Sequence, residues 1–78
     1  MFYVTMTDKF MSGWGHAQNK TNKLIIECNT IDEAEQIERA ARRRNEMKYV
    51  NICTRRPRYG AHVVESWKTY ADMTGWRA

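Results

Sequence analysis

The chain has 78 residues, a formal net charge of +4 and 42% hydrophobic residues. A chain of this length forms one domain and buries only about 60% of the surface that it exposes when unfolded. We therefore expect a single domain over residues 1–78 that acts from its surface, because a deep enclosed pocket is hard to fit into a core this thin. The sequence has no apolar run near the roughly 20 residues of a membrane span and no basic-then-apolar secretory signal. These absences predict a cytoplasmic protein without a membrane partner.

Two stretches near the N-terminus, residues 2–7 and 23–28, alternate between apolar and polar side chains. A period of two predicts half-buried strands. The loop between them is long for a hairpin and carries Phe10 and Trp14 among glycines. Two roles stay open for this loop. Trp14 either closes over an open sheet face, or is presented with Phe10 as an apolar anchor for a partner.

A helix is predicted over the stretch TIDEAEQIERAARRRN. Thr30 and Glu33 have the spacing of a capping box. Acidic residues precede basic ones along the stretch, as the helix dipole favours. An apolar stripe with spacings of three and four predicts that one side of the helix packs on a sheet. The stripe consists of Ile31, Ala34, Ile37 and Ala41.

Residues 47–54 predict a third strand, which a turn around Pro57 follows. Residues 62–70 favour a fourth strand because of their β-branched residues and Trp67, with a short helix as the alternative. The last residues, from position 71, predict a loose tail that Trp76 pins.

The order of these elements indicates an α+β fold: a small antiparallel β-sheet in β-β-α-β-β order, with one amphipathic helix packed on one face. The opposite face is expected to be partly open, or covered by the long loop. Its outer strands leave both a monomer and a homodimer open. The aromatic and apolar residues of that open face are Tyr3, Ile25, Tyr49 and Trp67.

The residues that could support metal or nucleophilic chemistry are few. His16, Cys28, Cys53 and His62 are zinc ligands by type, but none has the local spacing of a zinc site. Cys53 and His62 could form a thiol–imidazole pair, yet no acid and no glycine-rich oxyanion turn accompanies them. We therefore expect no enzymatic activity, no catalytic residue, no metal and no cofactor. The two cysteines are expected as free thiols, although one bridge between neighbouring strands stays open.

The distribution of charge is the strongest functional signal. Residues 39–58 carry eight basic residues against one acid, a net +7, so the remainder of the chain sums to −3. Pairing with Glu35 and Glu38 explains part of the helix charge, but it does not explain the run RRPR. Arginine recognises both phosphate and carboxylate groups, so the run predicts an anionic partner. The expected partner-binding residues are Arg39, Arg42, Arg43, Arg55, Arg56, Arg58, Phe10, Trp14 and Tyr59.

These arginines are expected to form two basic surfaces, one on the helix and one beyond the third strand. The interleaved aromatic residues Tyr49, Tyr59 and Trp67 could stack on nucleic-acid bases, or serve as ordinary strand aromatics. The partner is thus expected to be a host protein or ribonucleoprotein complex, with nucleic acid as the alternative.

The stretches YVTMTDKFMSGWGHA and EMKYVNICT resemble short open reading frames of bacteriophages and prophages, and the likeness extends to about Pro57. In size and element order the chain is similar to the small anti-CRISPR proteins, which share no diagnostic motif. This resemblance implies a protein that acts in the host bacterial cytoplasm by binding, without catalysis. It implies an inhibitor of a host defence complex, above all a multisubunit CRISPR effector. The alternative is a small nucleic-acid-binding protein with an arginine-rich surface.

Overall fold

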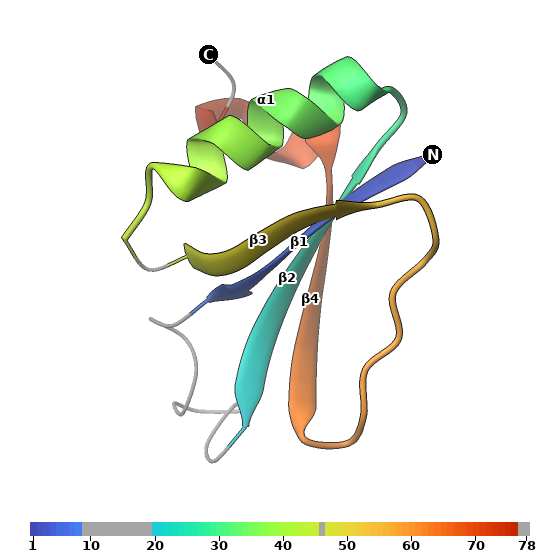
Figure 1. Cartoon of the computed structure of the whole chain (residues 1–78), viewed down its shortest axis with the longest axis vertical. Helices are drawn as coiled ribbons and strands as arrows, with labels where there is room; N and C mark the ends of the chain where they lie inside the picture. Colours follow the sequence, from blue (N-terminus) through green and yellow to red (C-terminus); the bar gives the residue numbers. More distant parts are fainter. Residues whose placement is uncertain (9–19, 46, 77–78) are drawn as a thin grey trace.

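The computed structural model describes residues 1–8, 20–45 and 47–76, which form a four-stranded sheet with a helix on one face (Figure 1). This arrangement confirms the predicted α+β fold and order of elements, and it shows residues 63–69 as a strand. The strands are β1 (Phe2–Asp8), β2 (Thr21–Cys28), β3 (Met47–Cys53) and β4 (Val63–Thr69); the helix is α1 (Ile31–Arg42), and two 3₁₀ turns follow, η2 (Tyr70–Asp72) and η3 (Thr74–Trp76).

The sheet has the strand order β3-β1-β2-β4 and is mixed. β1 is antiparallel to both of its neighbours, whereas β4 is parallel to β2, with Ile25 opposite Trp67. The prediction of a wholly antiparallel sheet was therefore wrong at this edge. The reason is that residues 54–62 do not turn back beside β3. They cross to the far edge of the sheet, so that β4 enters in the direction of β2.

The helix begins at the predicted cap, where the Glu33 N–H donates to Thr30 Oγ1 at 3.2 Å. The Glu33 carboxylate in turn accepts from the N–H of Asn29 at 2.9 Å. Three of the four predicted stripe residues are buried, but Ile31 is 43% exposed and Ala40 takes its place. Because small alanines form most of this stripe, α1 can lie close to the sheet.

The core lies between α1 and the sheet face that carries the aliphatic side chains. Its buried members include Val4, Met6, Leu24, Ile26, Cys28, Ile37 and Val50. Residues after β4 close one end of this core, where Met73 is buried and Trp76 packs against the cluster. The Tyr70 hydroxyl donates to Gln36 Oε1 on α1 at 2.7 Å. The predicted contact of Trp76 is confirmed, but residues 70–76 are two packed turns rather than a loose tail.

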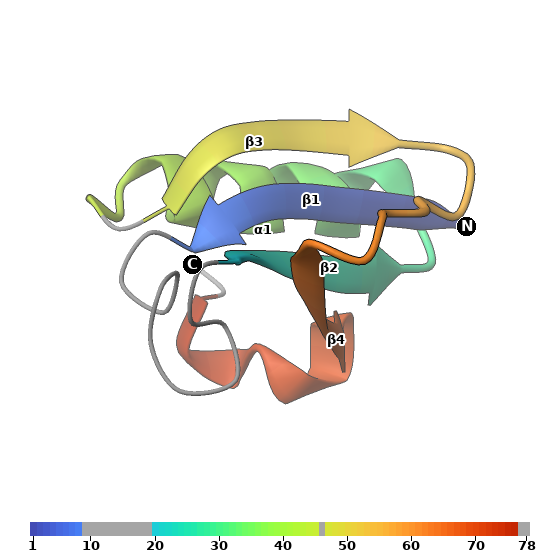
Figure 2. The same ribbon diagram turned by 90° about the horizontal axis from the view of Figure 1, so that it is seen from below.

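The opposite face of the sheet is crossed by residues 54–62, which we call the strap (Figure 2). At its far end the Thr21 N–H donates to the carbonyl of His62 at 3.1 Å. Beneath it, Ile25 has no exposed surface. The face that we predicted to be partly open is thus covered along its middle by the strap. Most of the first long loop, the other cover that we predicted, lies outside the described residues. We call this face the strap face.

Candidate functional site

Aromatic rings and cationic side chains lie together on the strap face. At one end of this face, an arginine is stacked on a tryptophan and paired with a glutamate. The Arg56 guanidinium lies 4.2 Å from the centroid of the Trp67 ring and 3.4 Å from Glu27 Oε1. Trp67 meets Tyr3 edge to face, with centroids 6.2 Å apart. These contacts connect the strap to β1, β2 and β4. They engage Arg56, the middle arginine of the RRPR run.

At the other end of the strap face, a single lysine lies between two tyrosines. Lys23 Nζ is 5.8 Å from the Tyr49 ring centroid and 5.9 Å from that of Tyr59, and it donates to Thr7 Oγ1. Burial raises the pKa of Tyr59, while a hydrogen bond with Thr5 opposes that rise. Lys23 is thus held as a fixed cation near β1 and β3.

Tyr49 reaches this position through a β-bulge in β3. Thr5 pairs with Asn51 but Thr7 pairs with Lys48, so β3 holds one more residue than β1 over this stretch. Tyr49 has a φ of 55°, a left-handed conformation that bulky residues rarely adopt. The Asn51 side chain supports the bulge by donating to the Tyr49 carbonyl at 3.2 Å. Tyr49 is 77% exposed.

The predicted arginines do form two basic surfaces, on opposite sides of the sheet. Arg39, Arg42 and Arg43 lie at the end of α1, whereas Arg55 and Arg58 lie on the strap, and all are exposed. We define Arg39 and Arg43 as the helix surface and Arg55 and Arg58 as the strap surface. Within residues 1–8, 20–45 and 47–76, none of these four side chains forms an ion pair.

Other predicted site residues are engaged within the fold. Arg42 pairs with Glu38 at 3.3 Å and donates to the carbonyl of Val50 at 3.3 Å. Arg56 is stacked on Trp67, and Tyr59 is half-buried. The predicted pair of Glu35 with Arg39 is not formed.

Phe10 and Trp14, which we predicted as an apolar anchor or a lid, lie outside the described residues, as does His16. Tyr49 was predicted only as one of three aromatic residues that could stack on bases or serve as ordinary strand aromatics. No glycine marks the bulge there, and the nearby Asn51 is a weak signal for it.

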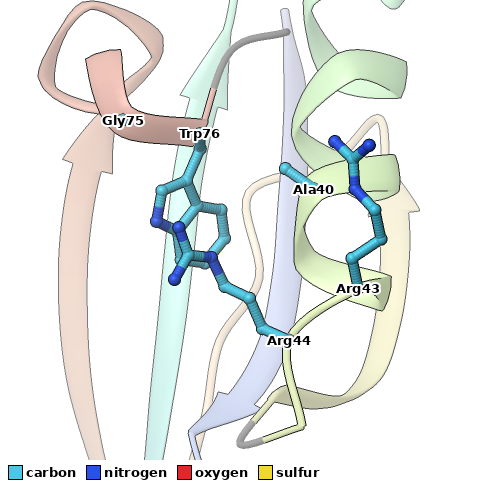
Figure 3. Close-up of a pocket in the computed structure, with 5 residues that line it drawn as sticks. All are labelled: Ala40, Arg43, Arg44, Gly75 and Trp76. Atoms are coloured by element: carbon cyan, nitrogen blue, oxygen red, sulfur yellow. The ribbon is translucent and has the colours of Figure 1, made fainter.

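A second arginine–tryptophan stack joins the end of α1 to η3. The Arg44 guanidinium lies 4.4 Å from the Trp76 ring centroid, beside a shallow pocket of about 250 Å³ (Figure 3). The pocket is lined by Ala40, Arg43, Arg44, Gly75 and Trp76. It extends the positive helix surface toward the C-terminal turns.

The cysteines do not form the arrangements that the sequence left open. Cys28 is buried on the helix face, whereas Cys53 lies level with Tyr3 on the strap face, and both thiols are free. Burial, together with the nearby Glu33, raises the pKa of the Cys28 thiol to about 11, so this thiol is not a ready nucleophile. His62 lies beside Thr21, roughly 20 Å along β2 from the level of Cys53. The suggested Cys53–His62 pair was therefore wrong.

Among residues 1–8, 20–45 and 47–76, no group of three or more histidine, cysteine or acidic side chains is placed to hold a metal ion. None of the helical segments in these ranges has the length and apolar character that crossing a bilayer requires.

Comparison with known proteins gives no relative. The chain matches no protein family, no curated protein and no solved structure.

Proposed function

We propose that this protein is a phage-type inhibitory binding protein that blocks a host defence complex without catalysis. Its target would be a multisubunit CRISPR effector, at the surface that admits target DNA or recruits the nuclease. The observation that carries this proposal is the pair of basic surfaces on opposite sides of the sheet. Arg39 and Arg43 on one side, and Arg55 and Arg58 on the other, have no ion-pair partner among the described residues.

Positive charge on both sides suits a protein that fills a gap between two anionic surfaces. Exposed arginines steer association with an anionic partner, and they form strong, paired hydrogen bonds with carboxylates and phosphates once docked. A gap between the subunits of a large complex offers such surfaces at close range. An inhibitor that imitated DNA would need a strongly acidic surface, and this chain has a net charge of +4.

The alternative function is direct nucleic-acid binding, and one observation favours it. The exposed ring of Tyr49 lies next to the fixed amine of Lys23 on the same side as the strap surface. Direct binding to duplex DNA predicts an affinity that falls steeply with salt, with a slope near −0.9 for each phosphate contact. Binding to the effector that persists after nuclease treatment would instead favour the protein target.

The inhibitor proposal is tested by plasmid transformation of cells that carry an active multisubunit CRISPR effector. Expression of this protein is expected to restore transformation by a targeted plasmid. The variant R55E/R58E should lose this protection while keeping its melting temperature, because both side chains are exposed. R39E/R43E is the matched variant on the helix side, and loss of protection in both variants is expected if the protein bridges two anionic surfaces. Transformation that stays low with the wild-type protein would contradict the proposal for that effector.

A further inference from the structure

The described part of the chain has one non-glycine residue with a positive φ, and it is the exposed Tyr49. A left-handed conformation at a bulky residue is strained. The Lys23 amine lies 5.8 Å from the centroid of the Tyr49 ring, a cation–π contact that offsets little of this strain. A strained and exposed aromatic residue with so little packing is explained by a role outside the fold.

The surroundings of the ring indicate the chemistry of its partner. Lys48, Thr7 and Lys23 are paired across β3, β1 and β2, so their side chains share the strap face. The Lys23 amine is drawn toward β1 by its hydrogen bond to Thr7. Glu65 is paired with Lys23 on the far side, in β4, where its carboxylate accepts from the indole N–H of Trp67 at 2.9 Å. The Tyr49 ring therefore lies at the lysine end of this row of paired residues, away from Glu65.

We propose that Tyr49 is a base-stacking site for single-stranded nucleic acid, with Lys23 and Lys48 contacting the adjacent phosphates. This inference deepens the nucleic-acid-binding alternative, and it is independent of the inhibitor proposal, which rests on the four arginines. An exposed ring beside cations is the combination that single-strand-binding proteins use, because every base has a face that can stack. Bases in a duplex are already stacked on each other, so a lone ring selects a single strand.

The proposal is tested with a fluorescent oligothymidylate of roughly 12 nucleotides, a length within the range of known single-strand sites. Fluorescence anisotropy at about 50 mM salt would measure its affinity for the wild-type protein and for Tyr49 variants. Tyr49→Gly is expected to weaken binding roughly 5- to 150-fold, the range for losing one base stack. Tyr49→Phe keeps the ring and is expected to stay within about twofold of the wild type.

The same variants separate recognition from folding. Glycine adopts a positive φ without strain, so Tyr49→Gly should melt at or above the temperature of Tyr49→Ala. If Tyr49→Gly does not fold, Tyr49→Asn replaces it, because asparagine also tolerates this conformation. A variant that stays folded but loses the oligonucleotide supports the proposal.

Three results would overturn it. The first is wild-type affinity in the folded Tyr49→Gly variant. The second is equal affinity for an oligonucleotide that lacks its bases, and the third is preferential competition by an acidic polypeptide, which would assign the surface to a protein. None of these results bears on the plasmid assay with the arginine variants, so the two proposals can fail separately.

Discussion

The two faces of the sheet are closed by different kinds of contact, and two neighbouring residues of β2 show the contrast. Ile26 and Ile25 are adjacent and neither has exposed surface, yet Ile26 belongs to the core beneath α1 while Ile25 lies beneath the strap. The helix face is packed with aliphatic side chains. The strap face is held by aromatic rings, cations and one ion pair that is largely exposed.

This difference separates stability from recognition within one small sheet. Aliphatic burial beneath a regular helix contributes most of the folding free energy, because each buried methylene is removed from water and tightly packed. Contacts between exposed cations and rings contribute less, about 0.5–1 kcal/mol each. They leave charged groups at the surface, however, where a partner can reach them.

The largest effect that distinguishes the two faces is expected from truncating the two isoleucines. Ile26→Ala should lower the free energy of unfolding by about 2–5 kcal/mol, because it opens a cavity between α1 and the sheet. Ile25→Ala should cost less, since the irregular strap can move into the space left behind. Urea unfolding of both variants measures the difference, and equal losses would show that the strap is as rigid a cover as the helix.

A smaller effect is expected from pH, through the thiol buried on the helix face. The pKa of Cys28 is raised from 9.0 to about 11 in the folded protein, mainly by burial. The unfolded chain therefore releases this proton first, and stability is lost as the pH rises from about 9 to about 11. The loss is on the order of 2–3 kcal/mol.

Thermal melts across this pH range, repeated with Cys28→Ala, isolate the contribution of that thiol. The variant should show a shallower fall in melting temperature than the wild type. Parallel curves would mean that burial on the helix face does not hold the Cys28 proton.

The smallest effect is expected at the end of the strap face where Arg56 contacts Trp67 and Glu27. Arg56→Gln removes the stack on Trp67 and the exposed pair with Glu27, and should lower stability by no more than about 1 kcal/mol. The tryptophan emission should change, because the Trp67 ring loses its cation. Arg55→Gln is the matched control, and it should leave both the stability and the tryptophan emission near those of the wild type. A loss of stability larger than that of Arg56→Gln would contradict the assignment of Arg55 to recognition.

Much of the fold follows from patterns that are local in the sequence. The helix can be predicted because its cap, dipole charges and apolar stripe all lie within one stretch. The alternation of the strands correctly assigns Tyr3 and Ile25 to the face opposite the helix. The parallel entry of β4 could not be predicted. It depends on where the strap crosses the sheet, and the turn around Pro57 is compatible with either a hairpin or a crossover.

The candidate site was only partly predictable for the same reason. Counting charges locates the arginines and predicts two basic surfaces. It does not reveal that Arg56 is occupied by Trp67 and Glu27, because those contacts join positions distant in the chain. The bulge at Tyr49 arises from a shift in the pairing of β3 with β1, and such a register shift has no reliable sequence signal without a glycine.

The strand order also has a consequence for how the chain assembles. β1 precedes the other strands in the chain but lies inside the sheet. Among the described strands, only β1 and β2 follow each other in the sequence and also pair as antiparallel neighbours. Their pairing offers the most local nucleus, whereas β3 and β4 must each close a crossover before they add to opposite sides of it. Long-range pairings of this kind slow folding. We therefore expect this protein to fold more slowly than a helical bundle of equal length, and to complete its outer edge only after β4 has been synthesised.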